Sequence, residues 1–169
     1  MLVAAACAGD PAEGLRITRA DGSRVAVPGG VRAWCGPTQG EATEELTGPP
    51  GLYVLGGRLP GDDDEDPGSY WYFTRRQTDL ERAAELSLPV SSQRETALFV
   101  LDAPRDNELS SAQEQASGTI EVEEWGCERG DEVRLSVDAT LGSEFFEAPT
   151  VRVEGTVETE VGDPPAGYD

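Results

Sequence analysis

The most restrictive feature of this sequence is a strict two-residue alternation in its carboxyl-terminal third. Apolar residues occupy the odd positions from Val133 to Leu141, and polar residues occupy the even positions between them. The same period returns from Val151 to Val161, where Gly155 and Thr159 interrupt the series of valines. Because successive side chains of a strand point to opposite faces, the pattern predicts long strands with one face in the core and the other in water.

The rest of the chain predicts further strands. Glycine and proline, 20 and 12 residues respectively, separate short apolar runs throughout the sequence. Such frequent interruption is typical of an all-β chain. Further strands are expected at 15–18, 25–27, 32–35, 52–55, 70–74, 97–101 and 119–122. A capping-box pattern, Thr78 to Glu81, predicts one short helix near 79–86, and the polar stretch 103–117 is expected to be loop. We therefore predict a single antiparallel β-sandwich or flattened barrel of about eight strands.

The ends of the chain differ in composition from its centre. Residues 1–13 hold small apolar residues followed by Gly, Asp, Pro and Glu, and we interpret them as a signal remnant and tether. Residues 14–162 are expected to form the β-sandwich domain. The Pro- and Gly-containing residues 163–169 are expected to be a flexible tail. No apolar stretch approaches the roughly 20 residues that a membrane-spanning helix requires.

The charge composition excludes several classes of function. The chain has 33 acidic residues, 13 basic residues and no histidine, which gives a formal net charge of -20. Every basic residue is an arginine. Without His, the chain cannot form a Ser-His-Asp triad or a metal site with His ligands. Without Lys, it cannot form a P-loop or a Schiff base. The net charge also disfavours nucleic acid and anionic membrane surfaces as partners.

The first residues suggest how the protein is localised. Ala4, Ala5 and Ala6 precede Cys7, and the chain becomes polar at Asp10. This segment resembles the lipobox of bacterial lipoproteins, in which small residues precede a cysteine that becomes lipidated. The resemblance implies a signal peptide, lipidation of Cys7, and an exported protein at the outer membrane or cell surface, with the periplasm as an alternative. Contact with the membrane would then be through the lipid anchor alone. The alternative is a soluble protein with an unmodified Cys7.

A second resemblance concerns the strands themselves. The segments 117–122, 133–139 and 153–157 repeat a Gly-Thr or alternating apolar pattern. Over roughly residues 95–161 the chain is similar to the C-terminal strands of uncharacterised, exported β-rich lipoproteins from GC-rich bacteria. This resemblance implies a location and a fold, and it brings no catalytic residues with it.

The lipobox resemblance bears on the three cysteines. If Cys7 carries lipid, Cys35 and Cys127 remain as a pair, and each has a tryptophan within two residues. A disulfide between them would close a loop of about 90 residues and contribute about 4 kcal/mol in the chain-entropy model. Such a bond requires an oxidising compartment, in agreement with export. The alternative is two reduced, buried thiols.

The acidic run 61–68 contains a candidate calcium site. Asp62, Asp64 and Asp66 have the every-second-residue spacing of a Ca²⁺-binding loop, and carboxylate oxygen is the ligand that Ca²⁺ prefers. However, the turn glycine is displaced to Gly68, and Phe73 stands where a bidentate Glu is usual. A solvated acidic loop is therefore the favoured interpretation, and we expect no other cofactor.

The aromatic run Tyr70 to Phe73 contains a candidate ligand-binding surface. Alternation places Tyr70 and Tyr72 on one face of a strand and Trp71 and Phe73 on the other, so that one pair is expected in the core. Tyr70 and Tyr72 could then stack on sugar rings, although ordinary packing is the favoured interpretation.

These observations predict an exported, lipid-anchored protein with a binding or structural role, rather than an enzyme, and with no catalytic residues assigned. Its expected partner is a protein or a glycan, and the sequence leaves the oligomeric state open. The first alternative is a carbohydrate- or calcium-dependent binding module. The second is a glycoside hydrolase that uses a pair of carboxylates, although no two acidic residues stand out for that role.

Overall fold

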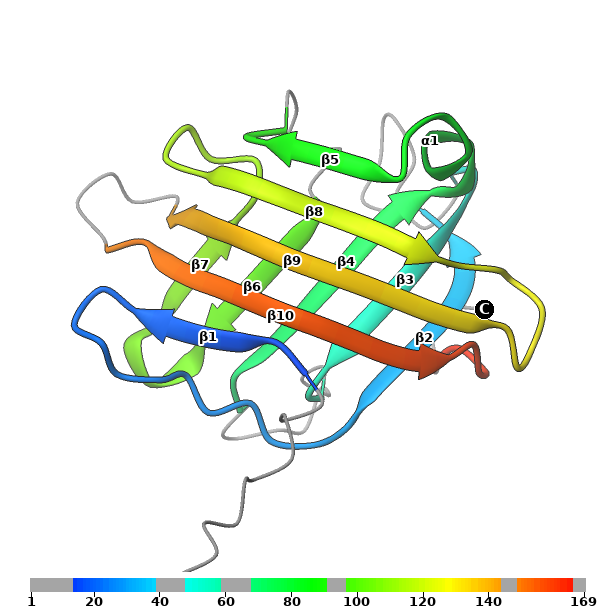
Figure 1. Cartoon of the computed structure of the whole chain (residues 1–169). Helices are drawn as coiled ribbons and strands as arrows, with labels where there is room; N and C mark the ends of the chain where they lie inside the picture. The colour runs from blue at the N-terminus through cyan, green and yellow to red at the C-terminus, as the bar shows by residue number, and fades with distance from the viewer. Residues whose placement is uncertain (1–13, 39–47, 59–67, 91–96, 144–148, 166–169) are drawn as a thin grey trace, which may run out of the picture.

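The computed structural model describes residues 14–38, 48–58, 68–90, 97–143 and 149–165. Within these ranges the fold is all-β and antiparallel, with a single short α-helix, which confirms the predicted fold class (Figure 1). The strands are β1 (Arg16–Arg19), β2 (Val31–Pro37), β3 (Pro50–Gly56), β4 (Tyr70–Arg76), β5 (Glu85–Leu88), β6 (Leu98–Asp102), β7 (Asn107–Ser110), β8 (Ser117–Glu124), β9 (Glu132–Ser143) and β10 (Val151–Glu160). The helix α1 spans Gln77–Arg82, and a 3-10 turn spans Ala103–Arg105.

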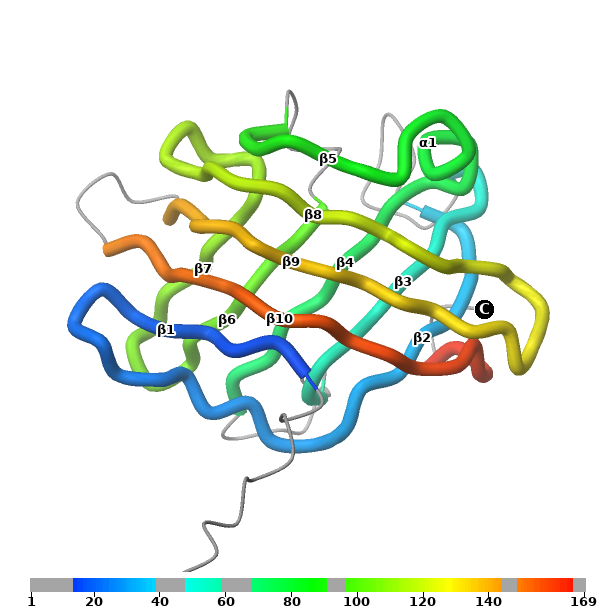
Figure 2. Tube along the Cα trace, in the orientation of Figure 1, coloured from blue at the N-terminus to red at the C-terminus, as the bar shows by residue number. Residues whose placement is uncertain are grey.

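One curled sheet forms a half-barrel in which two layers face each other. The front layer of Figure 1 has the strand order β5-β8-β9-β10-β1, and the back layer has the order β7-β6-β4-β3-β2. The tube view in Figure 2 shows that the strands of the two layers cross at a steep angle. The layers join where β9 passes from β8 and β10 to β7, with Leu109 opposite Ser143. On the other side, Val161 just beyond β10 forms a parallel bridge to Ala33 in β2.

The alternation that dominates the sequence builds the front layer. β9 and β10 pair along ten positions, from Val151 opposite Leu141 to Glu160 opposite Glu132. The apolar odd positions of β9 face the back layer, and each is at most 4% exposed. They pack against the inward side of the back layer, where Leu52, Val54 and Leu98 are fully buried. Burial of this shared apolar face is what holds the two layers together.

Gly155 lies inside β10 at a point of close backbone approach. Its φ of +133° is one that residues with a Cβ rarely adopt, and a Cβ placed there would lie 3.0 Å from the carbonyl oxygen of Gly14. The backbones of β10 and of the residues before β1 therefore approach closely at Gly155.

The predicted short helix is present, although its bounds differ, and two other local predictions, a strand at 25–27 and a loop at 103–117, were wrong. The helix occupies 77–82 instead of 79–86, because Ala83 is extended (φ -154°, ψ 117°) and the chain continues into β5. Leu86 and Leu88 alternate, and they pair with Ile120 and Gly118 of β8. The stretch 103–117, expected to be loop, contains β7, where pairing with both β6 and β9 and the complete burial of Leu109 select a strand.

Candidate functional site

The structure contains the predicted disulfide between Cys35 and Cys127, whose Cα atoms are 5.5 Å apart. Cys35 belongs to β2, at the end of the back layer, and Cys127 lies in the turn between β8 and β9 of the front layer. The amide nitrogen Nε2 of Gln77, at the start of α1, lies 2.8 Å from Sγ of Cys127. The bond therefore connects the two layers near the end at which α1 begins, and both cysteines are half-buried.

The disulfide reinforces a side of the half-barrel that has few backbone hydrogen bonds. Next to it, β2 meets the end of β10 through the bridge between Ala33 and Val161 and through a hydrogen bond of 2.8 Å from the Gly162 amide to the Ala33 carbonyl. A cross-link between residues 92 positions apart removes much conformational freedom from the unfolded chain. In the chain-entropy model this contributes about 4–5 kcal/mol.

The run Tyr70 to Phe73 is divided between the two faces of β4, as the alternation predicts. Trp71 and Phe73 point into the core and are 2% and 0% exposed. Tyr70 and Tyr72 are half-buried on the opposite, outer face of the back layer. The ring of Tyr72 stacks on that of Phe99 in β6 at a centroid distance of 5.2 Å, and Tyr70 lies 6.1 Å from the same ring.

Tyr70 and Tyr72 are part of a larger cluster on this outer face. We call it the outer aromatic cluster, and its members are Trp34, Tyr53, Leu55, Tyr70, Tyr72 and Phe99. The rings of Trp34 and Tyr53 are parallel and 5.2 Å apart, and the Tyr53 hydroxyl donates a hydrogen bond of 2.8 Å to the Pro37 carbonyl. Trp34 is only 1% exposed and Leu55 is fully buried. The half of the cluster on β2 and β3 is therefore packed, whereas the two tyrosines of β4 are more accessible.

Sequence reasoning identified Tyr70 and Tyr72 but missed Trp34, Tyr53 and Phe99. Each of these three lies next to a core residue on its own strand, so the alternation could have placed all three on the outer face. What the sequence did not contain was the strand order β2-β3-β4-β6, which places residues far apart in the chain side by side. An accessible aromatic ring can stack on the apolar face of a ligand.

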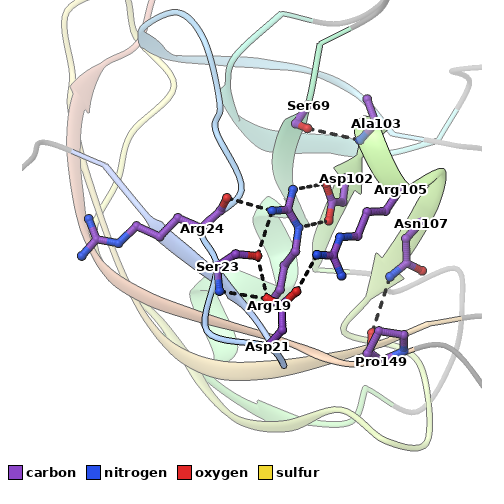
Figure 3. A network of polar contacts seen from close by, with 10 residues as sticks. All are labelled: Arg19, Asp21, Ser23, Arg24, Ser69, Asp102, Ala103, Arg105, Asn107 and Pro149. Carbon is purple, nitrogen blue, oxygen red and sulfur yellow. Dashed lines mark hydrogen bonds and ion pairs between the residues drawn. The ribbon is translucent and has the colours of Figure 1, made fainter.

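A second polar arrangement, which the sequence did not reveal, lies where β1 meets the end of β6 (Figure 3). The Arg19 guanidinium donates two hydrogen bonds to the Asp102 carboxylate, from Nε at 2.6 Å and from Nη2 at 2.7 Å. Its remaining nitrogen, Nη1, donates to the Ser23 hydroxyl and to the Arg24 carbonyl. Asp102 is 1% exposed and the Arg19 side chain is 13% exposed, so this ion pair is largely buried, and the hydrogen bond to Asp102 raises the pKa of Arg19.

A second ion pair lies beside it. Arg105 Nη2 donates to Asp21 Oδ2 at 2.5 Å, while the Ser23 hydroxyl and amide donate to Asp21 Oδ1. These hydrogen bonds from Ser23, together with the one from Arg105, hold the pKa of Asp21 below its usual range. Ion pairs thus connect the turn after β1 to the 3-10 turn after β6, and every polar group discussed is satisfied within the protein. We assign the arrangement a structural role.

The acidic residues of the last strands lie on the solvent face of the front layer, where arginines are interspersed among them. Arg134 binds Glu158 at 2.9 Å, Arg16 binds Glu154 at 3.1 Å, and Arg152 binds Asp138. These pairs are exposed and join neighbouring strands. They form a solvated polar coat, and Asp102 is the one acidic side chain that is buried in the part of the chain that the structure describes.

Two predicted sites lie outside the described residues: the candidate calcium ligands Asp62, Asp64 and Asp66, and the lipidation residue Cys7. Within the described ranges, no three side chains among Cys, Asp and Glu are grouped so that they could hold a metal ion. The same ranges contain no helix with the length and hydropathy needed to cross a membrane.

A scan of protein-family models finds no match to this chain, and searches of curated proteins and of solved structures find none either.

Proposed function

We propose that this chain is an exported bacterial protein, anchored by a lipid on Cys7 to the outer membrane or cell surface, with the periplasm as the alternative location. Its role would be in binding or in structure rather than in catalysis. The observation that carries this proposal is the Cys35–Cys127 disulfide. Disulfides persist in oxidising compartments outside the cytoplasm, and small exported domains use them to supplement a limited core.

The surface chemistry supports the same proposal. A net charge of -20 keeps an exported domain soluble and keeps it away from anionic membrane surfaces. The exposed carboxylates described above are bound to arginines of neighbouring strands rather than gathered in a cleft. A protein of this kind would need a lipid to remain at a membrane.

The experiment expresses the gene with its native upstream sequence in a bacterial host and examines the purified membrane and periplasmic fractions. We expect mass spectrometry to find a diacylglycerol-modified Cys7 in the membrane fraction. Non-reducing peptide mapping should find Cys35 and Cys127 in one linked peptide pair. A Cys7→Ser variant is the control, and it should leave the membrane fraction but keep the disulfide. An unmodified Cys7 in exported protein would refute the anchor, and two free thiols would refute the observation on which the proposal depends.

The outer aromatic cluster favours a second candidate function, a carbohydrate-binding module that uses Tyr70 and Tyr72, with calcium at Asp62, Asp64 and Asp66. A glycan array probed with and without a chelator tests both parts. The double variant Tyr70→Ala/Tyr72→Ala should lose any glycan signal, while the control Thr140→Ala, on the solvent face of β9, should keep it. Binding by both variants alike would exclude the two tyrosines as the ligand surface.

A further inference from the structure

Among the described residues, the curled sheet has three edge strands, and two of them are closed by the chain itself. The outer side of β1 is covered by residues 23–25, which follow it in the chain. The Val25 amide donates a hydrogen bond to the Ile17 carbonyl, and the Arg19 amide donates one to the Ser23 carbonyl. The outer side of β2 is bonded to Gly162 and carries the disulfide at Cys35. The third edge strand, β5, pairs with β8 alone.

The hydrogen-bonding pattern defines which groups of β5 remain open. The Ala84 carbonyl accepts a hydrogen bond of 3.0 Å from the Val122 amide of β8. Backbone groups alternate in direction along a strand, so those of Leu86 and Leu88 also face β8. The N–H and C=O groups of Glu85 and Ser87 therefore point away from the sheet. In the described part of the chain, no backbone group bonds to these four groups. They form a short, unpaired sheet edge, which Figure 1 shows as the upper rim of the front layer.

The side chains of β5 divide by chemistry between the two faces of the sheet. Leu86 and Leu88 are half-buried and pack against the main core. Glu85 is exposed on the opposite face, directly across from Glu121 of β8, which is exposed as well. Neither carboxylate forms an ion pair with a described arginine. Like charges at directly opposite positions repel each other, so a cation beside this pair would stabilise the sheet edge.

We propose that β5 binds an extended segment of a partner protein by strand addition, and that this segment alternates apolar and basic residues. The open N–H and C=O groups of Glu85 and Ser87 would provide the main-chain hydrogen bonds. The apolar side chains of the added strand would continue the row of Leu86 and Leu88, and the basic ones would lie beside Glu85. This inference goes beyond the proposed function and does not depend on where the protein resides.

The charge pattern also selects a foreign strand over a second copy of this chain. If β5 paired with β5 of another copy, it would add a second set of Glu85 and Glu121 carboxylates to the same face, without a counter-charge. The net charge of -20 opposes such self-association in general. Sedimentation of the protein alone should therefore show no dimer that depends on β5.

The test uses the full ¹⁵N-labelled chain and three short synthetic peptides. The first peptide alternates arginine and valine, the second alternates glutamate and valine, and the third has the composition of the first with its arginines grouped at one end. Without peptide, the amides of Glu85 and Ser87 should exchange with solvent faster than those of Leu86 and Leu88. The first peptide should slow the exchange at Glu85 and Ser87 at least tenfold, and the other two should not. Equal protection by the first and third peptides would show non-specific attraction of charge and overturn the proposal.

Two variants keep the proposal falsifiable. Ser87→Pro removes an outward N–H that β8 does not use, so the fold should persist while binding of the alternating peptide is lost. Glu85→Gln retains every backbone group and should weaken binding about threefold, since cross-strand charge pairs have small energies. The matched control is Glu132→Gln, which removes the same charge from an exposed position of β9 and should leave the affinity unchanged. Unaltered binding by Ser87→Pro and Glu85→Gln, or equal weakening by Glu85→Gln and Glu132→Gln, would overturn strand addition at β5.

Discussion

The Arg19 guanidinium binds the Asp102 carboxylate through two hydrogen bonds, although the two residues are 83 positions apart in the chain. Asp102 is 1% exposed and the Arg19 side chain is 13% exposed. Removing one partner of a buried pair leaves the other charge without compensation, and this cost exceeds the value of the pair itself. The geometry therefore makes this ion pair the most sensitive polar contact described above.

We expect Asp102→Ala to lower the free energy of unfolding by about 3–5 kcal/mol, because it leaves the largely buried Arg19 guanidinium without its counter-charge. Urea denaturation followed by circular dichroism measures the change. Arg16→Gln is the control, since the Arg16–Glu154 pair is exposed and should contribute less than about 1 kcal/mol. If Asp102→Ala were no more destabilising than this control, the pair would not have the importance that its burial indicates.

Removal of the disulfide should weaken the junction between the two layers. We expect the double variant Cys35→Ala/Cys127→Ala to lose about 2–5 kcal/mol of stability. Amide hydrogen exchange should accelerate most in β2, whose other backbone-to-backbone contacts with the described part of the front layer are at residues 161 and 162. Cys7→Ala serves as a control for cysteine removal and should have no effect on the folded domain. Uniform acceleration across all strands would contradict a localised role.

The Asp21 carboxylate should titrate below the usual aspartate pKa of about 3.9. Its pKa is lowered by hydrogen bonds from the hydroxyl and amide of Ser23 and by the bond from Arg105. Because the pKa is lower in the folded than in the unfolded state, Asp21 stabilises the fold above about pH 4, and this contribution is lost as the pH falls further.

NMR titration of the Asp21 side-chain carbon measures this pKa directly. Ser23→Ala should raise it most, and Arg105→Gln should raise it less, in the order of their contributions. A wild-type midpoint at or above 3.9 would contradict the hydrogen-bond geometry.

Gly118 at the start of β8 should not tolerate a side chain. Its φ is +103°, and a Cβ would overlap the carbonyl oxygen of Asp138 on β9. We expect Gly118→Ala to cost at least about 1–3 kcal/mol, measured by thermal or urea unfolding. Gly30→Ala is the matched control, because no atom lies within 4 Å of its Cβ position and its φ lies outside the left-handed region. Equal stability of the two variants would show that β8 can shift to accommodate the methyl group.

Much of the fold could be predicted from the sequence because it depends on local pattern. The period-2 alternation of residues 133–141 and 151–161 determines which face of β9 and β10 is buried, whatever their neighbours. The same rule separated Trp71 and Phe73 from Tyr70 and Tyr72. The absence of His and Lys excluded whole classes of chemistry in the same way, since composition does not depend on folding.

Only the tertiary structure decided which strands become neighbours and which of their edges stay open. Leu109 lies in a polar stretch whose pattern predicted a loop, and it forms a strand because β6 and β9 each supply a hydrogen-bonding edge. Asp102 follows an apolar run with no sign of a partner, and its counter-charge comes from β1. The unpaired edge at Glu85 exists because, among the described residues, β5 pairs with β8 alone. Hydrophobic alternation is a local property that can be recognised in a few consecutive residues. Strand pairing depends on the free energy of bringing distant segments together, and a short segment of sequence does not determine that free energy.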